Sequence, residues 1–264
     1  MRYTLISLDI STKKVLKKDF IGAAFRGWLG HALKCDTKRS CADCGDTLQC
    51  PYFMVFREHS EVRPYSLMAF KDKENITAFI RLFGDKKKMA PRILSSINAR
   101  NGIPNFDGLE YNIESIEAKN LEIKPVKMGN ILRLVTTSPL SLKSNGQLEV
   151  LPSFNTLLRS CIRSYNKITK YHDIQNYPFH VSEEIRDLDA ELLDFDVQVV
   201  KHQHTNIKKK TIKMGGISGW MDYETSSMPA EVATILGMGE SLQIGKHTVY
   251  GYGGFMMLDR EDLT

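Results

Sequence analysis

The order of the predicted elements indicates an α+β fold built from two similar halves. The first half begins with a strand at residues 3–10, continues through a helix and two strands, and ends with a second helix and further strands. From Lys127 the chain starts a comparable alternation again. A β-α-β-β-α-β order is typical of a ferredoxin-like unit. We therefore predict two tandem ferredoxin-like domains, residues 1–126 and 127–264.

The elements of the first half follow from the spacing of their apolar side chains. Phe20, Ala24 and Trp28 recur at helical spacing and predict a helix over residues 19–34, although several glycines weaken it. A cysteine-rich loop is inserted after this helix. Residues 51–56 are expected to form a buried strand or the approach to one. The later elements of this half are predicted as a strand at 75–83, an amphipathic helix at 89–99, and one or two strands at 109–123.

The second half contains a long predicted hairpin whose tip is basic. Its strands are expected at 195–203 and 210–223, and the candidate RNA-binding residues at the tip are Lys208, Lys209 and Lys210. Such a tip can clamp a nucleic-acid strand, or it can simply be solvated. The other elements of this half are predicted as strands at 130–137 and 255–258 and helices at 154–170 and 230–236.

A glycine-rich segment near the end of the chain is the most informative motif. Six glycines among residues 237–254 surround Lys246 and His247, which predicts a backbone that passes very close to another group. Tight glycine turns with a nearby cation form concavities for anions. The alternative is a β-bulge in a strand-to-strand connection, and the sequence lacks a Walker pattern. The candidate RNA-binding residues here are Gly245, Lys246, His247, Tyr250, Gly251 and Gly253.

The charge distribution favours a nucleic-acid partner over a membrane. The formal net charge is only +5, but lysines cluster at residues 13–18, 86–88 and 208–213. A solvated surface would explain any one cluster alone. No apolar stretch approaches the roughly 18 residues of a membrane helix, and the chain opens with a strand pattern rather than a signal peptide. We therefore expect a cytoplasmic protein that binds no membrane.

Four of the five cysteines lie close together in the sequence, as Cys35, Cys41, Cys44 and Cys50. In a cytoplasmic protein this clustering favours a structural zinc site with four thiolate ligands. Reduced or redox-paired thiols and an iron–sulfur cluster are the alternatives. With four protein ligands such a zinc would have no open position for water, so we expect no cofactor in catalysis.

Four segments together resemble one family. They are Phe25–Leu33 in the first helix, the cysteine loop that runs into Pro51–Phe56, Leu134–Leu142, and the glycine segment Ile244–Gly253. In this order they resemble the CRISPR-associated repeat-processing endoribonucleases of the Cas6 family, in the RAMP superfamily. The resemblance runs nearly end to end and implies two RAMP-type (RRM-like) ferredoxin domains. It implies CRISPR repeat RNA, within precursor crRNA, as the partner, and other Cas proteins of an effector complex as further partners.

The resemblance also implies a metal-independent reaction in which the ribose 2′-OH attacks the adjacent phosphate and leaves a 2′,3′-cyclic phosphate and a 5′-OH. Such chemistry needs a base, an acid and cations. The resemblance points to His31 as the catalytic histidine, with His59 second, and Arg26 and Lys34 at helical spacing could hold the phosphate. Alternatively, His31 packs against the cysteine loop and Arg26 forms a buried ion pair.

Two hypotheses compete with an endoribonuclease. A non-catalytic RAMP subunit would grip guide RNA without cutting it. A DNA-binding zinc module would use the cysteine cluster, but no basic recognition helix lies beside the cysteines in the sequence.

Overall fold

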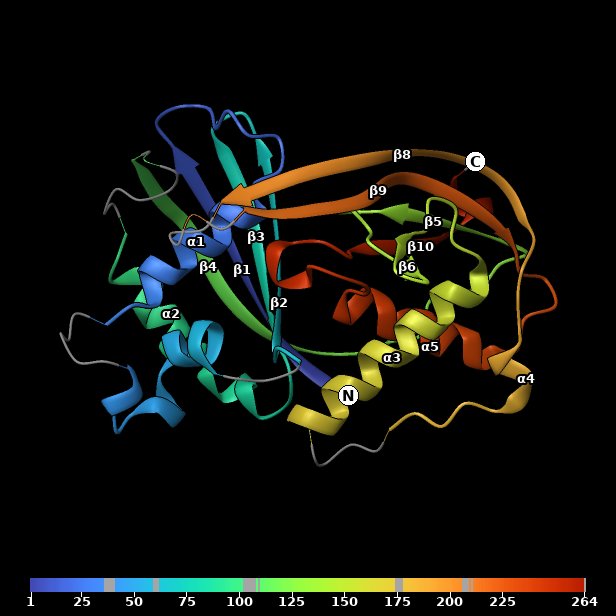
Figure 1. Cartoon of the computed structure of the whole chain (residues 1–264), viewed down its shortest axis with the longest axis horizontal. Coiled ribbons are helices and arrows are strands. Elements are labelled where there is room, and N and C mark those ends of the chain that lie inside the picture. Colours follow the sequence, from blue (N-terminus) through green and yellow to red (C-terminus); the bar gives the residue numbers. More distant parts are fainter. Residues whose placement is uncertain are drawn as a thin grey trace. The chain divides into compact units, whose positions relative to one another are not determined.

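The computed structural model describes residues 1–35, 41–58, 62–101, 108, 110–173, 178–205, 209 and 211–263. Within them the chain forms two four-stranded antiparallel sheets with helices, which confirms the predicted α+β fold of two ferredoxin-like halves (Figure 1). Contacts between residues divide the chain into two units. The N-terminal unit comprises Arg2–Leu121 and Tyr171–Asp173, and the C-terminal unit comprises Met1, Glu122–Lys170 and Ile174–Thr264.

The sheet of the N-terminal unit has the strand order β2-β3-β1-β4. Strand β1 pairs with β3 from Thr4 opposite Leu82 to Ser11 opposite Asn75, and alternate β1 residues, including Ile6 and Leu8, are fully buried. This alternation is what a half-buried strand requires. The elements of this unit are β1 (Arg2–Thr12), α1 (Gly22–Leu33), β2 (Tyr65–Asp72), β3 (Asn75–Leu82), α2 (Ala90–Asn98) and β4 (Tyr111–Glu122).

Residues 51–56 do not form a buried strand, which was one of the two structures expected for them. These residues are helical and end in the π-helical turn Phe53–Arg57, whereas the strand that follows α1 is β2. The run after Pro51 is apolar without alternation, and such a short run does not distinguish a buried strand from a helical turn. Proline is also favoured in the first turn of a helix, where its missing N–H costs nothing.

The sheet of the C-terminal unit has the order β10-β5-β9-β8, and β8 and β9 form one long hairpin (Figure 1). Its core joins buried residues of both kinds of element, such as Leu134 of β5 and Leu157 of α3. The elements are β5 (Ile131–Thr136), β6 (Lys143–Ser144), β7 (Gln147–Leu148), α3 (Phe154–His172), α4 (Glu183–Arg186), β8 (Leu192–Thr205), β9 (Thr211–Glu224), α5 (Ala230–Leu242) and β10 (Phe255–Asp259). Short helical turns occupy Cys41–Asp43, Thr47–Gln49, Gly84–Met89, Thr248–Tyr250 and Arg260–Leu263.

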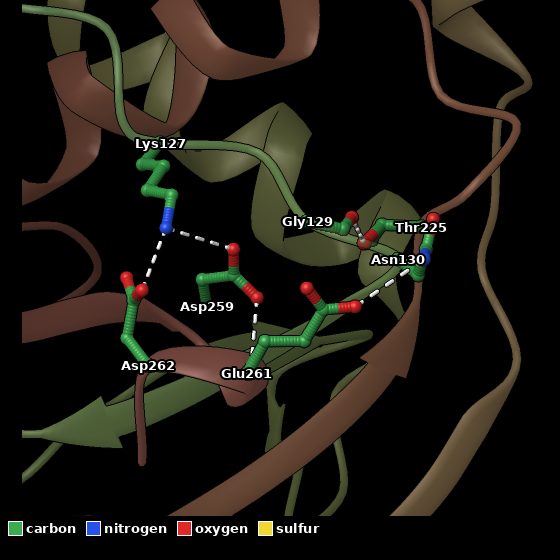
Figure 2. Close-up of polar contacts among 7 residues, drawn as sticks. All are labelled: Lys127, Gly129, Asn130, Thr225, Asp259, Glu261 and Asp262. Atoms are coloured by element: carbon green, nitrogen blue, oxygen red, sulfur yellow. Dashed lines mark hydrogen bonds and ion pairs between the residues drawn. The ribbon is translucent and has the colours of Figure 1, made fainter. Parts of the chain in front are cut away.

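Residues near the start of the C-terminal unit form ion pairs and hydrogen bonds with residues near the end of the chain (Figure 2). The Lys127 ammonium lies 3.3 Å from a carboxylate oxygen of Asp259 and 2.6 Å from one of Asp262. These hydrogen bonds raise the pKa of Lys127. A side chain at Gly129 would not fit, because its Cβ would lie 2.2 Å from Asp259 Oδ1. The contact therefore holds the entry to β5 and the exit of β10 together.

Among the residues that the structure describes, no helix is long and apolar enough to cross a bilayer.

Candidate functional site

The glycine-rich segment joins a helix to a strand, from the end of α5 to the start of β10. The predicted strand-to-strand connection is therefore wrong, and so is the alternative of a β-bulge in a hairpin. The segment is held against residues 138–142. The Lys246 N–H donates to the Ser141 carbonyl (3.0 Å), and the Gly253 N–H donates to the Pro139 carbonyl (2.8 Å). These bonds hold the segment in one conformation.

The close approach predicted from the glycines is made to the protein's own backbone. Gly245 has φ +81°, and a Cβ there would lie 2.4 Å from the Ser141 carbonyl oxygen. Gly253 has φ +86°, and a Cβ there would lie 2.1 Å from the Ile244 carbonyl oxygen. Gly251 also has a positive φ, of 91°. At these positions glycine is required by the fold of the loop.

The loop nevertheless presents polar groups to solvent. Gly245 and Lys246 are exposed and His247 and Tyr250 are half-buried, whereas Gly251 and Gly253 are buried. His247 adopts a left-handed conformation with φ 66°. Burial, together with the charges of Lys143 and Lys246, lowers the pKa of the His247 imidazole. The positive charges of Lys143 and Lys246 therefore favour the neutral form of this imidazole.

A cluster of histidine and tyrosine rings connects this loop to the β8–β9 hairpin. His202 Nδ1 lies 2.6 Å from the Tyr252 hydroxyl, and the His247 ring lies 5.7 Å from the Tyr252 ring. The His204 ring lies 5.8 Å from that of Tyr250. Burial raises the pKa of Tyr252 to about 12, so its hydroxyl stays protonated at neutral pH.

Sequence reasoning did not assign Tyr252 to this cluster. The signal that could have pointed to it is the alternation of His202 and His204, because residues two apart in a strand share one face. Which residues lie opposite that face depends on the tertiary structure.

The basic tip of the hairpin is only partly described. Lys209 is exposed and has φ 57°, while Lys208 and Lys210 lie outside the described residues. Their role in RNA binding stays a prediction.

Helix α1 carries an open face with the predicted catalytic histidine. His31 lies in the last turn of α1 and is exposed, and Lys34, which caps the C-terminal end of the helix, is exposed as well. Gly27, one turn before His31, is also exposed, and a Cβ placed on it would meet no atom within 4 Å. A ligand can therefore approach this face closely.

Arg26 lies elsewhere on α1 and makes a different contact. Its guanidinium lies 4.7 Å from the centre of the Phe56 ring, and the same ring would lie 3.0 Å from a Cβ at Gly30. The helical turn at the end of the cysteine loop thus packs on α1 through Phe56. His59, the second histidine candidate, lies outside the described residues.

Arg100 is a further cation near this face that sequence reasoning missed. Its guanidinium donates to the Lys34 carbonyl (3.2 Å), while its own carbonyl accepts the Tyr111 hydroxyl (2.7 Å). A cation at the C-terminal end of a helix is favoured by the helix dipole. No sequence signal indicates this contact, because Arg100 follows α2 and reaches α1 only in the folded unit.

The cysteines do not assemble the predicted four-thiolate site. Cys35 is exposed, Cys41, Cys44 and Cys50 are partly exposed, and all four are free thiols. Within the described ranges, no group of three or more His, Cys, Asp or Glu side chains could hold a metal ion. The four thiols are therefore not gathered around one point as a tetrahedral zinc centre requires, and structural zinc stays a prediction.

Comparison with known families accounts for both halves of the chain. Residues 134–255 match the family of the CRISPR-associated endoribonuclease Cas6, and residues 1–130 match a family described as an N-terminal domain. The Cas6 match contains the glycine-rich loop and the β8–β9 hairpin, whereas α1 and His31 lie in the N-terminal match.

Solved structures with the same fold include members of the Cas6 family. A Cas6 product complex has a TM-score of 0.64 at 16% identity, over 98% of this chain and 100% of that chain. Thermus thermophilus Cas6 has a TM-score of 0.62 at 14% identity, over 97% of this chain and 98% of its own. A RAMP protein that binds different RNA substrates has a TM-score of 0.53 at 12% identity, over 97% and 100%. At such identities the likeness shows the fold alone. A search of curated proteins finds no match.

Proposed function

We propose that this protein binds CRISPR repeat RNA and cleaves precursor crRNA once per repeat. The observation that carries the proposal is the Cas6 match over residues 134–255, which spans the glycine-rich loop. The likeness to a Cas6 product complex over nearly the whole chain supports it.

We assign the chemistry to the open face of α1. A base removes the proton of a ribose 2′-OH, the 2′ oxygen attacks the adjacent phosphorus, and the bond to the 5′ oxygen breaks as that oxygen takes up a proton. The products are a 2′,3′-cyclic phosphate and a 5′-OH. We assign one of the two proton roles to the His31 imidazole, because histidine is the side chain that most often serves as a general acid or base.

The same face offers cations for the charge that develops on the phosphate. Lys34 is exposed beside His31, and Arg100 is held at the Lys34 carbonyl. A positively charged group that is already in place stabilises a developing charge without further reorganisation. Arg26 is the weaker candidate for this role, because its guanidinium is stacked on Phe56.

The glycine-rich loop is proposed to grip the RNA backbone. Lys246 projects from a loop that is hydrogen-bonded at both ends, so little conformational freedom remains to be lost when RNA binds. The β8–β9 hairpin contributes Lys209 and, beyond the described residues, Lys208 and Lys210.

The proposal is tested with end-labelled repeat RNA in excess EDTA. We expect a single cut and a 5′-OH on the downstream product. The upstream product should carry a terminal phosphate that phosphatase removes only after acid has opened the cyclic phosphate. Cleavage that needs added divalent metal would contradict the mechanism. Cleavage at many positions would contradict repeat processing.

A second candidate is a non-catalytic RAMP subunit that binds guide RNA. The fold likeness to a RAMP protein that binds different RNA substrates favours it. Tight binding of RNA that stays intact, both in excess EDTA and in a parallel assay with magnesium, would support this candidate over the enzyme.

A further inference from the structure

The C-terminal unit contains a pocket of about 360 Å³ between helix α3 and the segment that leads into α4. It lies apart in sequence from the glycine-rich loop and from the β8–β9 hairpin. Its basic lining residues are Arg159 and Arg163 of α3, Arg186 of α4 and His180. No residue assigned above to RNA binding or catalysis lines it.

The pocket combines exposed cations with an apolar floor. Arg159, Arg163 and Arg186 are exposed, whereas Ile162 and Phe179 are partly buried and pack against the core of the unit. The core residues Leu158 and Ile185 also line it and are almost fully buried. A ligand would therefore meet apolar surface below and positive charge around the opening.

The three guanidinium groups form no ion pair with the acidic residues that the structure describes. No carboxylate lines the pocket, and within the described part of the chain Arg159, Arg163 and Arg186 form no ion pair. Arg159 and Arg163 are four residues apart on α3, a spacing at which like charges repel one another along a helix. An anionic ligand would relieve this repulsion.

The walls of the pocket are held in place before any ligand binds. The Asn166 amide donates to the Phe179 carbonyl (3.1 Å) and accepts from the Phe179 N–H (2.7 Å). The Asn155 amide donates to the carbonyls of Arg186 (2.9 Å) and Leu188 (2.8 Å). Both asparagines lie on α3, so they fix the facing segment at two points.

We propose that this pocket binds one unpaired nucleotide of the repeat RNA, a claim that rests on the proposed function. A nucleotide pairs a flat, largely apolar base with an anionic phosphate. An exposed base stacks on aromatic and apolar side chains, and guanidinium forks bind phosphate through two parallel hydrogen bonds. The volume lies within the range of small-ligand sites. Phe179 and Ile162 contact the base, and the arginines contact the flanking phosphates.

The test compares the double variant Arg159→Ala/Arg163→Ala with Lys124→Ala, which removes one exposed charge from the same unit outside the pocket. Binding of fluorescent repeat RNA is measured by anisotropy between 50 and 300 mM salt. We expect the double variant to bind roughly tenfold or more weakly, because it loses charged hydrogen bonds. We also expect the slope of log affinity against log salt concentration to fall in magnitude by about 1.4, because two phosphate contacts to single-stranded RNA are lost. Lys124→Ala should leave both values unchanged.

A second arm locates the contact. Repeat RNA that carries 4-thiouridine is cross-linked to the wild-type protein, and we expect the modified peptide to contain Ile162 or Phe179. An unchanged affinity and slope in the double variant, with no cross-link in residues 158–186, would overturn the proposal. Binding of 5′-AMP with an unchanged RNA slope would assign the pocket to a free nucleotide instead.

The two proposals fail in different ways. If the wild type cuts repeat RNA but the double variant binds it with unchanged affinity and slope, the pocket assignment is wrong and the endoribonuclease stands. If the wild type binds RNA through the pocket but never cuts it, the enzyme is wrong and the pocket stands.

Discussion

The open face of α1 and the glycine-rich loop present their candidate residues in opposite ways. On α1, His31 is exposed, as is Lys34 just beyond it, and a Cβ placed on Gly27 would meet no atom within 4 Å. In the loop, the glycines fit against backbone carbonyls within the C-terminal unit, and Lys246 projects from a segment fixed by hydrogen bonds. Replacing the exposed His31 side chain should therefore change function with little effect on stability, whereas substitutions of loop glycines should lower stability first.

The largest expected effect is that of His31→Ala. Loss of a general acid or base should slow cleavage of repeat RNA by roughly 100-fold or more. Because the side chain is exposed, the thermal midpoint and the RNA affinity should stay near those of the wild type. Single-turnover kinetics, anisotropy and a thermal melt measure these three quantities. A variant that cuts at the wild-type rate would remove His31 from the mechanism and leave His59 as the next candidate.

Gly253→Ala should destabilise the protein severely. The new methyl group would lie 2.1 Å from the Ile244 carbonyl oxygen at a positive φ, so the free energy of unfolding should fall by roughly 3 kcal/mol or more. Gly27→Ala is the matched control on α1. Alanine in an exposed helix interior should raise the free energy of unfolding by roughly 0.5–1 kcal/mol. Urea unfolding measures both, and equal effects would contradict the contrast between the two surfaces.

Lys246→Ala should weaken RNA binding without unfolding the protein. The side chain is exposed, and the hydrogen bond to Ser141 uses the Lys246 backbone N–H, which the variant keeps. The magnitude of the salt slope should fall by about 0.7–0.9, as expected for one lost phosphate contact. An unchanged slope would show that the loop serves only the fold of the C-terminal unit.

The smallest effect should come from His247, whose pKa is lowered by burial and by Lys143 and Lys246. Since its folded-state pKa lies below the unfolded value of about 6.5, the unfolded chain binds more protons between the two values. Stability should therefore rise with pH through that window and level off above it. His247→Gln should flatten this rise in unfolding curves measured from pH 5 to 8. An equally steep rise in the variant would assign the pH dependence to another group, such as His172, whose pKa burial also lowers.

The spacing of apolar residues along the chain predicted most of the fold. Alternation in β1 and helical spacing in α1 and α3 depend on neighbours within the same element, so they can be recognised without the tertiary structure. The turn after Pro51 was assigned as a buried strand or the approach to one, and β2 was missed, because an apolar run of six residues has no period that distinguishes a strand from a helical turn.

The residues of the candidate site were less predictable than the fold. His31 and Lys246 were found because each lies within a motif that is contiguous in sequence. Arg100 and the three arginines of the pocket were not, because the groups that they lie against are on other elements, and for the same reason the contact of Tyr252 with His202 could not be foreseen.

The sequence by itself determined the two-part α+β architecture and the resemblance on which the proposed function rests, since both depend on local periodicity and on the order of short motifs. Only the tertiary structure decided what the loop glycines touch and that Arg26 stacks on Phe56. The physical reason is that these contacts join residues distant in sequence, and their distances are set by how helices and sheets pack.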